Sequence, residues 1–86
     1  MKFFDLQIVT PEGTMYDGKA LQLSVRAIDG SLSVLADHIP MVTALKKAPC
    51  RLYVDEKTIR EGESCGGILS VEKGRVRLLC TSFVFK

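Results

Sequence analysis

His38 is the only histidine in the sequence, so any nucleophilic triad or histidine-based proton transfer would depend on it. Asp37 precedes it directly, and an aspartate is the residue type that orients a catalytic imidazole in many hydrolases. Adjacent side chains of an extended segment point to opposite sides, however, so Asp37 is badly placed to hold the His38 ring. We interpret His38 as a hydrogen-bonded loop residue. The alternative is a fragment of an enzyme whose site is completed by another chain.

Cysteines and carboxylates are the other groups that could do chemistry. Cys50, Cys65 and Cys80 are an odd number of thiols without a close pair, which fits neither a disulfide framework nor a zinc site. We interpret them as reduced and mostly buried. Glu61 and Glu63 share one side of an extended segment, where they form a solvated edge unless they line an apolar pocket suited to acid–base catalysis. The sequence therefore predicts no metal, no cofactor and no catalytic residue.

Glycines and basic residues give no sign of phosphate recognition. Neither GxxxxGKS/T nor GxGxxG, the loops that wrap phosphates at the start of a helix, occurs in the sequence. Twelve Lys and Arg residues against ten Asp and Glu give a net charge of +2, and Lys46-Lys47 is the longest basic run. The phenylalanines lack an accompanying basic groove, which favours core or interface packing over base stacking. We expect no binding of nucleic acid or anionic lipid.

The elements that position these residues should form one domain. At 86 residues the chain lies within the single-domain range, and it contains no Gly/Ser/Pro-rich linker. No apolar run approaches the roughly 20 residues of a membrane-spanning helix, and the N-terminus lacks the apolar core of a signal peptide. We therefore expect a single domain over residues 1–86 that stays in the cytosol.

The strongest pattern in the sequence has a period of two residues. Between positions 21 and 27, apolar residues alternate with polar ones and predict a strand with one buried face. The dipeptide Asp29-Gly30 tolerates the positive φ angles of a tight hairpin. Residues 21–27 and 31–34 should therefore pair antiparallel.

Similar short units fill the rest of the chain. Alternation recurs in three further segments, each next to a polar turn: 4–8, 50–54 and 76–80, with turns at 11–13, 55–57 and 72–74. Many short strands with frequent turns predict an all-β antiparallel sandwich or small barrel, because each sheet has one apolar face to cover. At Gly66-Gly67 we favour a bulge, and the alternative is close approach of a partner's backbone.

The stretch 29–45, DGSLSVLADHIPMVTAL, resembles the epsilon subunit of bacterial and chloroplast F-type ATP synthases. In that family a glycine-led hairpin runs into a loop ending His-Ala-Pro, followed by Thr-Ala-Ile/Leu. Residues 66–71, GGILSV, resemble the family's Gly-Gly-Ile/Phe-X-X-Val segment, and 76–81 the strand that follows it. The opening residues 6–12 are similar to the family's first strand and turn. The resemblance covers essentially the whole chain, with Ile39 in place of the commoner alanine and Ser31 where an acidic residue is frequent.

This resemblance implies a β-sandwich of about ten short strands in two sheets, and a non-catalytic rotor role. The family's sandwich binds the gamma subunit of the central stalk and rests on the polar loops of the membrane c-ring, which couples ion-driven rotation to ATP synthesis. It implies a place at the cytoplasmic face of a bacterial membrane, reached only through the complex. The family continues into a two-helix domain that restrains ATP hydrolysis. The sequence has no counterpart to it, so we expect neither helical inhibition nor ATP binding.

Contact residues follow from the resemblance position by position. The residues expected to face the c-ring are Gly30, Ser31, Leu32, Asp37, His38, Ile39 and Pro40, and those expected to face gamma are Gly66, Gly67, Ile68, Thr81 and Phe83.

Apolar anchors for these interfaces are expected among Leu32, Ile39, Met41 and Phe83. Ordinary core burial is the alternative for each, and it is the one we favour for Met41. The competing function is a free-standing small β-barrel adaptor that binds a peptide or nucleic acid.

Overall fold

A computed structural model describes residues 2–86, and all of its regular elements are strands. The ten strands are β1 Phe4–Thr10, β2 Gly13–Ala20, β3 Gln22–Ala27, β4 Gly30–Val34, β5 Met41–Leu45, β6 Ala48–Tyr53, β7 Ile59–Ser64, β8 Gly67–Glu72, β9 Arg75–Cys80 and β10 Phe83–Phe85. No helix occurs in this part of the chain. The predicted all-β class is confirmed.

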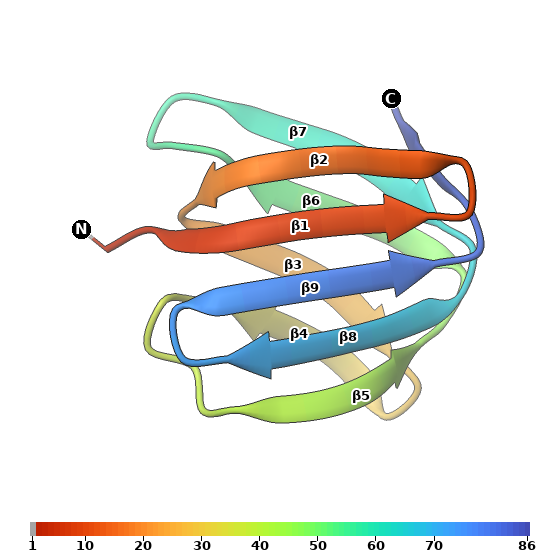
Figure 1. Ribbon diagram of the computed structural model, residues 1–86, viewed down its shortest axis with the longest axis horizontal. Helices are drawn as coiled ribbons and strands as arrows, with labels where there is room; N and C mark the ends of the chain where they lie inside the picture. Colours follow the sequence, from red (N-terminus) through yellow and green to blue (C-terminus); the bar gives the residue numbers. More distant parts are fainter. Residues whose placement is uncertain (1) are drawn as a thin grey trace.

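The strands form two layers that face each other (Figure 1). The front layer has the order β5-β8-β9-β1-β2, and the back layer consists of β4, β3, β6, β7 and β10. Neighbouring strands pair antiparallel, except that β1 and β9 run parallel. The predicted sandwich is therefore confirmed, with one parallel pair that the sequence pattern did not predict.

The two layers are not separate sheets, because β3 changes its hydrogen-bonding partner along its length. Its first residues, Gln22–Ser24, pair with β6 in the back layer, whereas Ala27 pairs with Leu45 of β5 in the front layer. The amide of Lys46 donates to the carbonyl of Arg26 at 3.1 Å and extends this second contact. The ten strands thus form one continuous sheet folded into two layers.

The core lies between the layers and follows the predicted alternation. Phe4, Leu6 and Ile8 of β1 are almost fully buried, as are Leu23 in β3 and Leu78 in β9. Full burial of such a side chain stabilises the fold by about 1.5–3 kcal/mol. Residue 21, predicted to lie in the β3 strand, instead precedes it in a bend.

The thiols are free, and the expectation that most are buried is confirmed. Cys50 and Cys80 are buried, whereas Cys65 is exposed in the turn before β8. Burial raises the pKa of the Cys50 and Cys80 thiols to about 11. Both groups are therefore protonated near neutral pH.

The bulge favoured at Gly66-Gly67 is wrong, because the register of β8 with both neighbours is unbroken from Gly67 onward. The close backbone approach seen at Gly67 comes from β9 of this chain, and approach of a partner's backbone stays a prediction. Gly67 has φ 152°, and a Cβ there would lie 2.3 Å from the carbonyl oxygen of Leu79. Only glycine fits this start of β8.

Strand registers define two ends of the sandwich. At the Gly30 end, Ala27 pairs with Gly30 in the β3–β4 turn and also with Leu45, the last residue of β5. Leu45 in turn pairs with Gly67, the first residue of β8. The His38 end contains residues 35–40, which leave β4 and enter β5 on the other side. These ends lie right and left in Figure 1.

Candidate functional site

The seven residues expected at the c-ring do not form one surface. Gly30 and Ser31 lie at the Gly30 end, and residues 37–40 lie at the His38 end. The five residues of β5 separate these ends by about 17 Å, at about 3.4 Å per residue. The predicted c-ring contacts therefore lie in two groups at opposite ends of β5.

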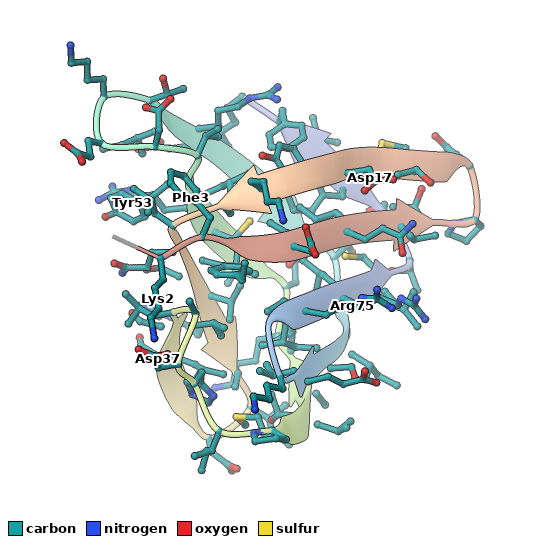
Figure 2. The ribbon with its side chains drawn as sticks, turned by 60° about the vertical axis from the view of Figure 1, so that its left-hand side comes forward. Lys2, Phe3, Asp17, Asp37, Tyr53 and Arg75 are labelled. Carbon is teal, nitrogen blue, oxygen red and sulfur yellow. The ribbon has the colours of Figure 1, made fainter. Side chains whose placement is uncertain are left out.

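His38 makes a local contact that confirms its interpretation as a hydrogen-bonded loop residue. Its Nδ1 lies 2.8 Å from the carbonyl oxygen of Ile39, and its amide donates to the carbonyl of Leu35 at 3.0 Å. Asp37 instead pairs with Lys2, at 3.3 Å between Oδ1 and Nζ (Figure 2). The structure therefore does not bring Asp37 and His38 together as a catalytic pair.

The four predicted apolar anchors divide into exposed and covered side chains. Ile39 is 74% exposed, the most accessible large apolar residue described. Leu32 and Met41 are half-buried against the core, as favoured for Met41. Phe83 is buried, and its ring occupies the space that a side chain at Gly62 would need. The ring of Phe83 thus packs inside the sandwich, and only its strand can lie near a partner.

The residues expected to face gamma gather where β8 begins. Gly66 and Gly67 lead into β8, and the Thr81 hydroxyl donates to the carbonyl oxygen of Cys65 in the preceding turn. This bond ties the β9–β10 turn to the β7–β8 turn. Ile68, the next residue, points away from the core and is 50% exposed.

Ile68 belongs to a larger apolar face on the outside of the front layer. Ala44, Ile68, Leu79 and Val9 are direct cross-strand neighbours on β5, β8, β9 and β1. Leu79 is 45% exposed, and Val42, two residues before Ala44 on β5, is 71% exposed. We call Val9, Val42, Ala44, Ile68 and Leu79 the apolar face.

Most of the apolar face was not predicted from the sequence. A signal was present in the doublets Ile8-Val9, Ile68-Leu69 and Leu78-Leu79, where both neighbours are apolar although they point to opposite faces of a strand. One member of each doublet is buried in the core, and the other lies on the apolar face. Such doublets indicate strands that are apolar on both faces.

The outer surface of the front layer becomes charged toward the His38 end. Glu72, Arg75, Asp5 and Lys19 are neighbours across β8, β9, β1 and β2 and alternate in sign. Nζ of Lys19 lies 2.7 Å from Oδ1 of Asp5. The hydrogen bond from Lys19, with its charge, lowers the pKa of the Asp5 carboxyl. On β8, β9 and β1 the apolar part of this surface is thus confined to the half near Gly67, whereas on β5 it extends to Val42.

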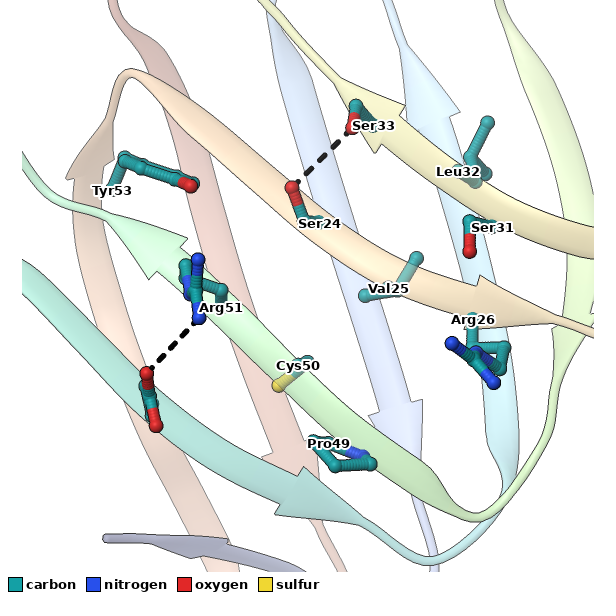
Figure 3. Close-up of a pocket in the computed structure, with 11 residues that line it drawn as sticks. Ser24, Val25, Arg26, Ser31, Leu32, Ser33, Pro49, Cys50, Arg51 and Tyr53 are labelled. Atoms are coloured by element: carbon teal, nitrogen blue, oxygen red, sulfur yellow. Dashed lines mark hydrogen bonds and ion pairs between the residues drawn. The ribbon is translucent and has the colours of Figure 1, made fainter.

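The outer surface of the back layer is polar. It contains a shallow depression of about 360 Å³, shown in Figure 3. The hydroxyls of Ser24 and Ser33 lie 3.3 Å apart, and Arg51 donates to Glu61 at 3.2 Å. Glu61 is exposed, which agrees with the solvated edge predicted for Glu61 and Glu63. Residues 2–86 contain no group of three or more side chains placed to hold a metal ion.

Within the described chain, no helix has the length and apolarity needed to cross a membrane.

The family model described as "ATP synthase, Delta/Epsilon chain, beta-sandwich domain" matches residues 3–86. The ATP synthase epsilon chain of Bacillus licheniformis is 43% identical over 79 residues, which cover 92% of this chain and 60% of that protein. The epsilon chain of Bacillus subtilis is 40% identical, with 92% and 59% covered. The chain thus spans about 60% of the length of these curated relatives.

Two solved assemblies contain a chain with the same fold. A chain of the Euglena gracilis mitochondrial ATP synthase OSCP/F1/c-ring structure superposes with a TM-score of 0.87 at 18% identity, covering 93% of this chain and 51% of that one. A chain of the Tetrahymena thermophila mitochondrial ATP synthase central stalk/c-ring structure gives 0.79 at 12% identity, covering 92% and 63%. At these identities the likeness shows the fold.

Proposed function

The chain belongs to the ATP synthase Delta/Epsilon family through its β-sandwich domain, and from this premise we propose that it is a non-catalytic rotor adaptor. It binds the gamma subunit of the central stalk and the polar loops of the c-ring, and it passes ion-driven rotation from ring to stalk. Its place is the cytoplasmic face of a bacterial cell membrane, held there through the complex. Curated relatives named epsilon chain support this role.

The observation that carries the proposal is the apolar face, which we assign to gamma. An exposed apolar patch that is bordered by polar groups is typical of a protein interface. The patch includes Ile68, which the family resemblance places toward gamma, and it adjoins Gly67 and the Thr81 turn. Arg77 and Ser70 border it on the side toward the His38 end. A stable contact buries about 800 Å² per partner, a modest share of the 5262 Å² accessible surface.

We assign the c-ring contact to the Gly30 end alone. Ile28 is 55% exposed at the β3–β4 turn, and Gly30 and Ser31 follow it. Lys46 and Lys47 lie in the β5–β6 turn, beside β3 through the bond from Lys46 to Arg26. A polar, partly basic turn of this kind suits polar ring loops.

Residues 37–40 are assigned to the stalk side and not to the ring. They lie at the opposite end from Gly30, and they lead directly into β5, which carries Val42 and Ala44 of the apolar face. Ile39, two residues before β5, is exposed and available to a partner. This assignment separates the two partners onto two surfaces, as an adaptor requires.

A stiff sandwich suits this role. Close-packed interiors have low compressibility and transmit strain, and the bond from Thr81 to the Cys65 carbonyl couples two turns next to Gly67. The described strands are assigned docking and coupling; the helical restraint of ATP hydrolysis is not part of their proposed role.

Cysteine cross-linking in the assembled ATP synthase tests the proposal. In a Cys65→Ser background, Ile68→Cys is expected to cross-link to gamma and Ser31→Cys to subunit c. Val84→Cys, on β10 and 64% exposed, is the matched control and should link to neither. Cross-linked products of Ile68→Cys that do not contain gamma would contradict the assignment. Binding of the isolated chain to a peptide or oligonucleotide, with no incorporation into the complex, would favour the free-standing adaptor instead.

A further inference from the structure

A second depression, with a largely apolar lining, lies at the His38 end, away from the apolar face and the Gly30 end. Its volume is about 520 Å³, within the range of sites that bind small ligands or side chains. Its lining residues are Lys2, Leu21, Gln22, Leu35, Tyr53, Asp55, Glu56 and Ile59. They come from the chain start, the β2–β3 and β4–β5 connections, and the β6–β7 hairpin.

The apolar part of this depression is accessible to solvent. Leu35 and Ile59 are each 52% exposed, although both are aliphatic and line the same hollow. Figure 2 labels Tyr53 and Lys2, which both line the depression, and Asp37, which pairs with Lys2. Apolar side chains gathered around a hollow indicate a place where a partner removes them from water.

The acidic side of the depression is preformed. The Asp55 Oδ1 accepts hydrogen bonds from the amides of Lys57 at 2.8 Å and Thr58 at 2.7 Å. The amide of Val54 donates to the Thr58 carbonyl at 2.9 Å, which closes the same turn. The backbone bond from Lys57 is the largest cause of the lowered pKa of Asp55. This carboxylate is thus fixed in place and stays ionised.

The charge around the depression is opposite to that of the whole chain. Lys2 is the one cation among the lining residues, and it already pairs with Asp37 at 3.3 Å. Asp55 and Glu56 leave a net negative charge at the mouth, whereas the chain carries +2. A cationic group is the complementary ligand.

We propose that this depression binds a lysine or arginine side chain of a partner protein. The aliphatic stem of that side chain lies over Leu35 and Ile59, and its cationic head lies between Asp55 and Glu56. Long basic side chains bury their methylene stems along apolar surface while the charge stays in water. The Tyr53 ring offers a further contact, because cations are attracted to aromatic faces. The chain already contains such a pair, with the Arg60 guanidinium 3.8 Å from the Phe85 ring centroid.

The first test is an NMR titration of the full chain with two small probes of equal length. n-Hexylammonium should shift amide signals at Leu35, Tyr53 and Ile59 with a Kd on the order of 1–10 mM, as expected for so few atoms. Hexanoate should bind at least about five-fold more weakly, because its negative charge is repelled by Asp55 and Glu56. Equal binding of both probes, or no saturable shift with hexylammonium, would overturn the proposal.

Two variants and one control make the test specific. Glu56→Lys should reverse the preference so that hexanoate binds better than hexylammonium, while Asp55 and its turn stay intact. Ile59→Ser should weaken hexylammonium about five-fold, through loss of apolar contact. Val84→Ser changes an exposed aliphatic residue on β10 and should leave both probes unaffected. An unchanged preference in Glu56→Lys would contradict the role of the acidic side.

A peptide distinguishes a protein partner from a free amine. Ac-Gly-Lys-Gly-NH2 and Ac-Gly-Arg-Gly-NH2 should shift the same amides as hexylammonium, and Ac-Gly-Glu-Gly-NH2 should not. Binding of hexylammonium without either basic peptide would overturn the protein-side-chain proposal and favour a small amine. The site is independent of the rotor role, so Ile59→Ser should leave cross-linking of Ile68→Cys to gamma unchanged.

Discussion

The outer faces of the two layers are built alike and differ in chemistry. On the front layer, four directly paired neighbours are Ala44, Ile68, Leu79 and Val9, and on the back layer the corresponding row is Ser33, Ser24, Arg51 and Glu61. Both rows lie over strands whose inward residues form the same core. The core therefore does not require an apolar outer row, and the difference indicates a binding function for the front face.

The largest expected effect on stability concerns two adjacent residues that lie on opposite sides of β8. Leu69 is fully buried, so Leu69→Ala should lower the free energy of unfolding by about 4 kcal/mol. Ile68 lies on the outer surface, and Ile68→Ala should change the free energy of unfolding by about 0.5 kcal/mol or less. Urea unfolding of both variants measures the difference. A similar loss in both would mean that the apolar face is needed for folding.

The next effect concerns the glycine that begins β8. In Gly67→Ala the new methyl meets the Leu79 carbonyl and the backbone is strained, which should cost about 3 kcal/mol. Gly30 has φ 134°, but nothing lies within 4 Å of a Cβ there, so Gly30→Ala should cost only about 1 kcal/mol. Thermal unfolding under identical conditions compares them. Equal losses of stability in the two variants would show that the close contact of Gly67 with β9 does not contribute to the cost.

Thiol reactivity probes the shared interior of the layers. Cys50 lies in β6 of the back layer and Cys80 in β9 of the front layer, and burial raises the pKa of both to about 11. At about pH 8, roughly one such thiol in a thousand is ionised, so both should react slowly with a disulfide reagent while exposed Cys65 reacts at once. Adding denaturant should make all three react alike. Fast labelling of Cys80 in the folded protein would contradict its burial.

The smallest effect is expected in the charged half of the front surface. The pKa of Asp5 is lowered from its ordinary 3.8, chiefly by the hydrogen bond from Lys19. A carboxyl with a lowered folded-state pKa contributes stability above its unfolded value, and this is lost as pH falls through the folded value. Lys19→Met should therefore raise the Asp5 pKa and reduce the acid dependence of stability below about pH 4. An NMR titration of the Asp5 carboxyl carbon gives the shift; Lys73→Met serves as a control.

Alternation of apolar and polar residues predicted five of the ten strands, β1, β3, β4, β6 and β9, and most of the core. Leu23, Leu52 and Leu78 lie inside as expected, because a side-chain period of two fixes which face of a strand a residue occupies. The same period does not say which strands pair. The parallel pairing of β1 with β9 and the change of partner along β3 therefore could not be predicted.

The contact surface was harder to predict than the fold. Gly30 and His38 are eight positions apart and belong to one sequence motif, yet β4 carries the chain to the other end between them. Phe83 has the residue type of an anchor, but glycine at position 62 makes room for its ring inside. The depression near Tyr53 combines the chain start with three separate connections, and no local pattern in the sequence brings these together.

The most direct test of the account measures the affinity for gamma of two double variants. Val42→Asp with Ile68→Asp places two charges on the apolar face, and Ser24→Asp with Ser33→Asp places two on the back layer. We expect the first pair to weaken binding at least about 100-fold in calorimetry, since desolvating charge at an interface centre costs several kcal/mol, and the second to change it by less than about three-fold. Circular dichroism confirms that both remain folded. Full affinity in the first pair, or its loss in the second, would contradict the assignment of gamma to the front face.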